Sequence, residues 1–179
     1  MTIRVLLQSI EKGAILVDNA ERYVPVGRGV VIYVAFLGDV DDAALEQAVA
    51  ALMSGILLRR SLPGGAPMTS TVSLNDCPDA DILVVPQASL GGKLKGHRVQ
   101  FHALVEKSRG LWLYDRFCQL LRAARGIDAS SVDANGVAAK EAVASPAFPQ
   151  GGRVINGTYG NRQGLKIESE GPLTHFLDL

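Results

Sequence analysis

Residues 83–102, which read LVVPQASLGGKLKGHRVQFH, join a strand pattern to a glycine-rich basic segment. The apolar run at 82–85 predicts a buried strand, and Gln87 and Ser89 place small polar groups where that strand ends. The glycines that follow let a ligand approach the backbone closely. Composition alone favours a solvated loop after the strand, because charge runs usually face water.

The alternative is a segment that binds an anion. Four basic or titratable side chains support it, and they are Lys93, Lys95, His97 and Arg98. Two known phosphate-binding motifs are excluded. The glycines at 27 and 29 precede their strand and lack the third glycine of a dinucleotide fingerprint, and the glycines at 91 and 92 lack the flanking residues of a P-loop.

Length and composition predict one globular domain over residues 1–179, with 47% apolar and 20% charged residues. The formal net charge of zero excludes a strongly basic nucleic-acid coat but leaves a local basic patch open. Cys77 and Cys118 are far apart, which suits a reducing compartment. We expect no metal and no cofactor, because three scattered histidines give no ligand spacing. With no apolar run of membrane length, we also expect no membrane partner and a cytoplasmic location.

Apolar alternation and turn residues predict a strand-rich chain. Expected strands cover residues 4–10, 14–18, 23–26, 30–37, 56–58, 68–74, 82–87, 153–156, 164–169 and 173–177. Helical spacing predicts one helix at 43–55, after aspartates that suit the helix dipole, and a second at 106–125, closed by Gly126. We expect the aromatic residues of the second helix to lie in the hydrophobic core.

The fold class that follows is α+β, with a curved, barrel-like and mostly antiparallel sheet and two main helices. Residues 62–70 form a Pro/Gly-rich loop in this interpretation. The segment at about 128–152 is rich in Ala, Ser, Pro and Gly without clear periodicity. It predicts a loop-rich excursion, with a short helix at 136–143.

A second motif lies near the C-terminus, where residues 168–175 read ESEGPLTH. Gly171-Pro172 between two strands indicates a tight turn. The turn is structural in its simplest interpretation. Its chemistry also suggests a site, because a glycine carbonyl followed by a proline gives rigid acceptors that could hold an amine.

Together the two motifs resemble the D-aminoacyl-tRNA deacylase family. That family has a Ser-Gln-x-x-Leu motif after a strand, which corresponds to PQASL at 86–90, and an Asn-x-Gly-Pro-x-Thr motif, which corresponds to SEGPLT at 169–174. The opening strands and the order of the two helices are also similar. Pro86 stands where the family has serine, and Ser169 stands where it has asparagine.

PQASLGGK at 86–93 and GTYGNRQ at 157–163 look more like the animal-type branch of the family. That branch also clears L-alanine from threonine tRNA, and its Gly-Pro bond is trans, whereas the main branch uses cis. The sequence leaves the isomer of Gly171–Pro172 open.

The resemblance implies hydrolysis of the ester between an amino acid and the terminal ribose of tRNA. The backbone at Ala88, Ser89 and Leu90 would donate to the developing oxyanion, and Gln87 and Ser89 would position the terminal adenosine, the ester or a water. The substrate's own 2′-OH would assist. The residues expected to bind the aminoacyl end are Pro86, Gly171, Pro172 and Thr174.

By the same resemblance, Gly171 and Pro172 reach into the neighbouring subunit's site, so a homodimer is implied. The basic segment at 93–98 would meet tRNA phosphates. Two alternatives stay open. One is a covalent mechanism with Ser89 as nucleophile and His97, His102 or His175 as base. The other is a non-catalytic RNA- or nucleotide-binding module on the same scaffold.

Overall fold

The computed structural model of the chain describes residues 1–60, 70–139 and 151–179. Its strands in chain order are β1 (Thr2–Ile10), β2 (Lys12–Leu16), β3 (Tyr23–Val26), β4 (Gly29–Leu37), β5 (Ile56–Arg60), β6 (Ser70–Ser73), β7 (Asp81–Pro86), β8 (Lys93–Lys95), β9 (Arg98–Gln100), β10 (Val154–Asn156), β11 (Leu165–Glu168) and β12 (Thr174–Asp178). The helices are α1 (Asp42–Ser54) and α2 (Lys107–Ala124), with 3-10 turns η1 (Ala88–Gly91) and η2 (Ala129–Ser131).

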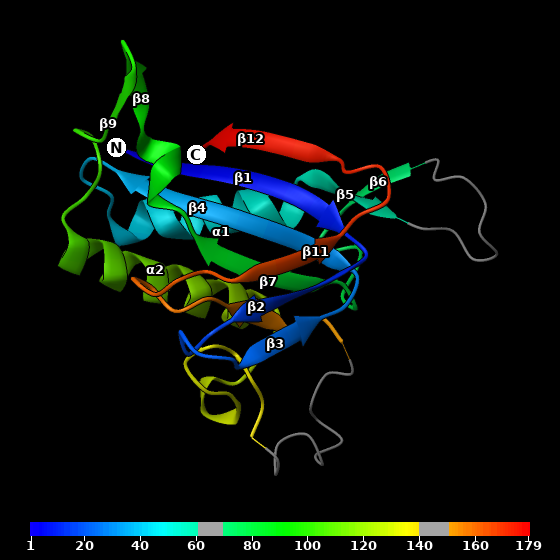
Figure 1. The fold of residues 1–179 in the computed structure, drawn as a ribbon. Helices are drawn as coiled ribbons and strands as arrows, with labels where there is room; N and C mark the ends of the chain where they lie inside the picture. Colours follow the sequence, from blue (N-terminus) through cyan, green and yellow to red (C-terminus); the bar gives the residue numbers. More distant parts are fainter. Residues whose placement is uncertain (61–69, 140–150) are drawn as a thin grey trace.

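A five-stranded sheet in the order β10-β7-β4-β1-β12 forms the centre of the molecule. β4 pairs with β7, and β7 with β10, in parallel, whereas β1 is antiparallel to both β4 and β12. A three-stranded antiparallel sheet, β11-β2-β3, lies across it. Figure 1 shows this small sheet on the near side of the large one and α1 behind it.

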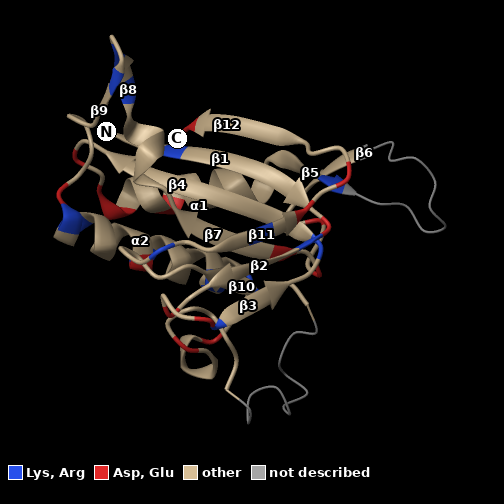
Figure 2. Ribbon diagram, viewed as in Figure 1, with Lys and Arg blue, Asp and Glu red and all other residues tan. Residues whose placement is uncertain are grey.

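Two further hairpins extend from this body. β5 and β6 pair at one end of the large sheet. β8 and β9 pair at the other end, with Gly96 in the left-handed region at their turn (φ +61°). This second hairpin protrudes from the rest of the molecule, and its ribbon is coloured blue for Lys and Arg in Figure 2.

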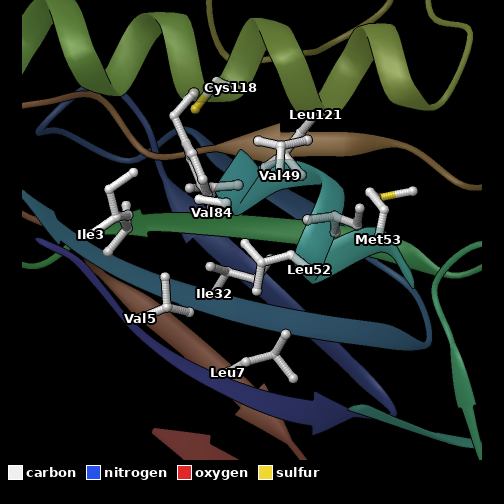
Figure 3. Packing of buried hydrophobic residues seen from close by; sticks show 14 of the residues in the cluster. Ile3, Val5, Leu7, Ile32, Val49, Leu52, Met53, Val84, Cys118 and Leu121 are labelled. Atoms are coloured by element: carbon white, nitrogen blue, oxygen red, sulfur yellow. The ribbon is translucent and has the colours of Figure 1, made fainter. Parts of the chain in front are cut away.

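Alternation along the central strands builds two apolar layers. On β4, Val30, Ile32 and Val34 face the helices, whereas Val31 lies in the cluster beneath the small sheet. The helix-side core also contains Leu52 and other apolar side chains from both helices, as Figure 3 shows. The central strands are therefore buried on both faces, which explains their near-continuous apolar sequence.

Local chemistry explains where the helices begin and end. The Asp41 side chain accepts from the N–H of Ala44 at 2.8 Å and caps α1. The Glu106 side chain accepts from the N–H of Ser108 at 3.0 Å and caps α2. Gly126, in the left-handed region at φ +68°, follows the last turn of α2. No helix within the described residues is long and apolar enough to span a membrane.

The α+β class, the two helices and most of the strand positions are confirmed. Strand pairing is mostly antiparallel, as expected, but the central sheet also contains the two parallel pairs β4–β7 and β7–β10, and the described sheets do not close into a barrel. Trp112 is 44% exposed, so the expectation of an aromatic core on α2 holds for Tyr114 and Phe117 but is wrong for this residue.

The expected short helix at 136–143 is wrong over its described part. Gly136 adopts φ +84° against the backbone of Val154, and Ala138 forms an isolated bridge with Val132. The side chain of Asp133 accepts from the N–H groups of Asn135 and Val137, which favours a turn over a helix. Residues 140–150 of the excursion and 62–69 of the expected Pro/Gly-rich loop lie outside the described residues.

Candidate active site

The first motif forms a tight turn at the end of a buried strand. β7 ends at Pro86, and the N–H of Gln87 donates to the carbonyl of Val34 at 2.9 Å, which fixes where the chain leaves the sheet. η1 follows at once, and the N–H of Leu90 donates to the carbonyl of Gln87 at 3.1 Å. We call residues 87–91 the catalytic turn.

The first backbone N–H groups of this turn are free to bind a group from outside the turn. The N–H of Leu90 is already used within the turn. No described backbone group accepts from the N–H groups of Ala88 or Ser89, and both residues are exposed. Unused amides at the start of a helical turn carry partial positive charge. These two donors are therefore available to a developing oxyanion.

Arg4 on β1 anchors the far side of the turn. Its Nη1 donates to the carbonyl of Leu90 at 3.1 Å, and its Nε and Nη2 bind both oxygens of Asp178 at 2.7 and 2.8 Å. This bidentate pair lowers the pKa of Asp178, mainly through the side-chain hydrogen bond. Arg4 thus connects the catalytic turn to the end of β12.

The segment at 157–163 forms the opposite wall. The hydroxyl of Tyr114 on α2 lies 3.1 Å from the carbonyl of Val84 and 3.0 Å from that of Gly157, so it joins β7 to this segment. The side-chain nitrogen of Gln163 donates to the carbonyls of Thr158 and Asn161 at 2.7 and 2.8 Å. These bonds hold the segment beside the turn without regular secondary structure.

A cavity of about 550 Å³ lies between the two walls. One wall supplies Pro86, Gln87, Ala88 and Ser89, and the other supplies Tyr159, Gly160, Asn161 and Gln163, with Lys107 at the start of α2. The sequence predicted the first wall. It gave the second wall no site role, although GTYGNRQ at 157–163 was one of the segments that carried the resemblance.

Tyr159 supplies the aromatic surface of the cavity. Its ring lies 5.7 Å from that of Tyr114, and Gly110 on α2 leaves room for its hydroxyl. Partial burial, and then the charge of Glu106, raise the pKa of Tyr159 above its ordinary value. The hydroxyl is therefore neutral at physiological pH and cannot serve as a base there.

The second motif forms an exposed corner between β11 and β12. Gly171 has φ +62°, and the Gly171–Pro172 peptide bond is trans, which answers the question that the sequence left open. The guanidinium Nη1 of Arg59 on β5 donates to the carbonyl of Gly171 at 2.7 Å. Thr174 opens β12 opposite Gln8 and is exposed. We call residues 170–173 the Gly-Pro corner.

The catalytic turn and the Gly-Pro corner lie at opposite ends of β1 within one chain. Arg4 contacts the turn through Leu90, whereas the N–H of Ser9 donates to the carbonyl of Leu173 beside the corner at 3.0 Å. Arg4 and Ser9 are roughly 17 Å apart along an extended strand. The structure therefore does not bring the two motifs together in a single subunit.

The four predicted tRNA-contacting residues do gather. Lys93 and Lys95 lie on β8, Arg98 opens β9, and His97 lies in the turn between them, all four exposed. This hairpin was not predicted from the sequence, although KLK and RVQ alternate around Gly96. The hairpin begins directly after the catalytic turn, which forms one wall of the cavity.

The described residues give little support for a covalent serine mechanism or for a metal site. No described histidine is hydrogen-bonded to Ser89, and His102 instead lies 3.2 Å from the side-chain oxygen of Gln100. The described chain also contains no group of three or more His, Cys, Asp or Glu side chains arranged to hold a metal ion. The cavity is thus lined by backbone amides, three amide side chains, two hydroxyls and one lysine.

Comparison with known proteins places this site in a class. The family model for D-Tyr-tRNA(Tyr) deacylase matches residues 6–178. The chain therefore belongs to this family of aminoacyl-tRNA deacylases, and the expectation of a hydrolase acting on the aminoacyl-tRNA ester is confirmed.

Individual relatives agree with this membership. A Leishmania major protein provisionally named D-tyrosyl-tRNA(Tyr) deacylase 2 is 50% identical over 97% of this chain and 100% of its own length. Human D-aminoacyl-tRNA deacylase 2 is 37% identical over 90% of this chain and 82% of its own length. A solved structure described as a probable eukaryotic D-amino acid tRNA deacylase superposes with a TM-score of 0.89 at 50% identity, covering 100% of both chains.

Proposed function

We propose that this deacylase removes D-amino acids, and L-alanine from threonine tRNA, at a site shared between two subunits. The observation that carries the proposal is the cavity between the catalytic turn and residues 157–163, with two unused amides at its edge. The ester carbonyl would lie against the N–H groups of Ala88 and Ser89. Donors placed this way stabilise the oxyanion of the tetrahedral intermediate, typically by about 3–4 kcal/mol for one donor.

The cavity suits the 3′ end of an RNA. Tyr159 offers a ring face on which the terminal base can stack, which contributes about 1–3 kcal/mol for a base on an aromatic side chain. Gln87 and Asn161 line the same cavity and can bind the ribose or the base edge through their amide groups. Since Tyr159 stays neutral and no carboxylate lines the cavity among the described residues, the substrate's 2′-OH is the best-placed group to relay a proton from the attacking water to the leaving 3′-oxygen.

The sheet topology supports a two-fold dimer. β12 is an edge strand of the large sheet, with the Gly-Pro corner before its first residue and Asp178, which binds Arg4, as its last. When two copies of one strand pack side by side across a two-fold axis perpendicular to them, they run in opposite directions. The corner of one subunit would then meet the catalytic turn of the other. Phe176 on β12 is 59% exposed and would be buried in such a contact.

The trans isomer supports the finer assignment to the animal-type branch, because the resemblance implies that isomer for the branch that clears L-alanine. The human relative, at 37% identity, is named a D-aminoacyl-tRNA deacylase, which supports the D-aminoacyl part of the proposal. We therefore expect the protein to accept both configurations of a small aminoacyl group.

Deacylation of D-tyrosyl-tRNA and L-alanyl-tRNA(Thr) by the purified protein tests the proposal. Turnover of both substrates is the expected result. Turnover of D-tyrosyl-tRNA alone would show that the protein does not remove L-alanine from threonine tRNA. Retained tRNA binding with turnover of neither substrate would favour the non-catalytic module.

A Ser89→Ala variant tests the mechanism separately. The hydroxyl of Ser89 is not needed for the backbone N–H at the same position, so we expect a rate within about threefold of wild type. A covalent serine mechanism instead requires a loss of several orders of magnitude. A loss of that size, with an unchanged melting temperature, would restore the covalent mechanism.

A further inference from the structure

The guanidinium group of Arg59 is directed at the Gly-Pro corner. Its Nη1 lies 2.7 Å from the carbonyl oxygen of Gly171 and 3.5 Å from that of Glu170. A Cβ atom added at Gly171 would lie 2.6 Å from the same nitrogen, and its φ of +62° also favours glycine. The corner therefore fits closely under the arginine.

The same end of β1 fixes both partners of this contact. The side-chain oxygen of Ser9 accepts from the N–H of Arg59 at 3.2 Å. The carbonyl of Ser9 accepts from the hydroxyl of Ser169 at 2.8 Å, and its N–H donates to the carbonyl of Leu173 at 3.0 Å. Ser9 thus holds the arginine and both sides of the corner in one arrangement.

Arg59 differs from the arginines that share its surroundings. Arg28, Arg59 and Arg153 line one cavity of about 520 Å³, together with Asp76, Asp79 and Asp81. Arg28 pairs with Glu11, and Arg153 pairs with Asp81 at 2.7 Å. None of the ion pairs among the described residues involves Arg59. Its charge is directed at backbone carbonyls rather than at a carboxylate.

We propose that Arg59 is a positioning residue that sets the stereochemical selectivity of the deacylase; this inference rests on the proposed function. A carbonyl that already accepts from a guanidinium is turned toward it and is a weaker acceptor for a second cation. The positive charge of Arg59 also opposes the approach of the substrate's α-ammonium group. Gly171 therefore acts on the aminoacyl group only by limiting the space around it. Because Gly171 does not bind the α-ammonium, both configurations at the α-carbon are tolerated.

The test compares Arg59→Ala with wild type on D-alanyl- and L-alanyl-tRNA(Thr). Freeing the Gly171 carbonyl lets it accept from the ammonium, which fixes one configuration at the α-carbon. We expect the ratio of the two kcat/KM values to change by about tenfold, the size of one hydrogen bond to a charged group. Arg59→Lys keeps the charge and one donor, so it should restore most of the wild-type ratio. Arg28→Ala, from the same cavity, should leave the ratio unchanged.

An unchanged ratio in Arg59→Ala, or an equal fall of both rates, would overturn the inference while leaving the proposed function intact. Wild-type protein that hydrolyses neither substrate would instead remove the proposed function. In that case, backbone hydrogen exchange over residues 169–174 tests whether Arg59 positions the Gly-Pro corner. Exchange at least about fivefold faster in Arg59→Ala than in Arg28→Ala supports the positioning role, and equal exchange in the two variants rejects it.

Discussion

At the scale of single residues, Arg4 connects parts of the chain that are far apart in sequence. It binds Leu90 of the catalytic turn and Asp178 of β12, and its guanidinium lies 5.3 Å from the ring centre of Phe176. We expect Arg4→Ala to lower kcat about tenfold with little change in KM, because a looser turn misplaces the oxyanion donors. Steady-state deacylation kinetics measure the two constants.

Two controls accompany this prediction. Arg116→Ala removes an arginine on α2 that pairs with Asp42 of α1 at 3.2 Å, and it should leave kcat unchanged. Asp178→Asn removes the ion pair but keeps the Leu90 contact, so its effect on kcat should be smaller. Equal kcat in Arg4→Ala and wild type would contradict the prediction.

Because the pKa of Asp178 is lowered in the folded protein, the stabilising contribution of the pair is present above the ordinary carboxyl pKa and is lost as the pH falls through the lowered value.

Cys118 gives a second prediction at this scale. Complete burial is the main cause that raises its pKa to about 12. At pH 8 only about one thiol in ten thousand is then ionised, and the thiolate is the reactive form. We expect iodoacetamide to leave Cys118 unmodified in the native protein at pH 8 and to modify it after unfolding in denaturant, as measured by peptide mass spectrometry. Rapid native modification would show that the α2 core opens readily.

At the scale of elements, the β8–β9 hairpin carries the electrostatic prediction. Replacing Lys93, Lys95 and Arg98 together with glutamine should weaken tRNA binding. It should also reduce the slope of log K against log salt by about two to three, since each lost phosphate contact contributes about 0.7–0.9. Filter binding over a salt series measures the slope.

The matched control removes the same charge from another surface of the same subunit. Lys12, Arg22 and Lys166 lie on or near the small sheet and are exposed. Their joint replacement with glutamine should leave the slope within about one unit of wild type. An unchanged slope in the hairpin variant would show that the phosphates bind elsewhere.

Elements with strong local signals were predictable from the sequence. β3 is confirmed residue for residue, and β4 needs only Gly29 added, because apolar runs and flanking glycines define both. The caps at Asp41 and Gly126 likewise set the helix ends by local chemistry. The β8–β9 hairpin was missed because three-residue strands rich in lysine carry almost no β propensity.

The site was predictable only where it is local in sequence. PQASL forms one wall of the cavity as expected, because a strand end and its turn are adjacent in the chain. Arg4 and Arg59 act through contacts across 86 and 112 residues, with Leu90 and Gly171. Pairing of distant strands creates these contacts, and no local pattern encodes it.

At the scale of the whole molecule, the exposed face of β12 is the proposed subunit contact. We expect Phe176→Ser to shift the protein toward monomer, because the change removes an apolar side chain that is 59% exposed in the single chain. Light scattering over a concentration series measures the molar mass. Leu111→Ser, on α2 and 44% exposed, is the matched control and should leave the mass unchanged. Equal molar masses for the two variants would show that the subunit contact does not involve β12.

Mixing two inactive variants tests whether each site is built by two subunits. Gln87→Ala impairs the catalytic turn, and Gly171→Ala impairs the Gly-Pro corner, where a Cβ would lie 2.6 Å from the Arg59 guanidinium. In a mixed dimer with shared sites, one site combines both defects and the other combines an intact turn with an intact corner. Equal mixing after subunit exchange should therefore restore about one quarter of wild-type activity, because half of the dimers are mixed and each has one intact site. If the turn and the corner of the same chain formed the site, every site in the mixture would carry one defect. Activity would then stay at the level of the separate variants, and the shared site would be rejected.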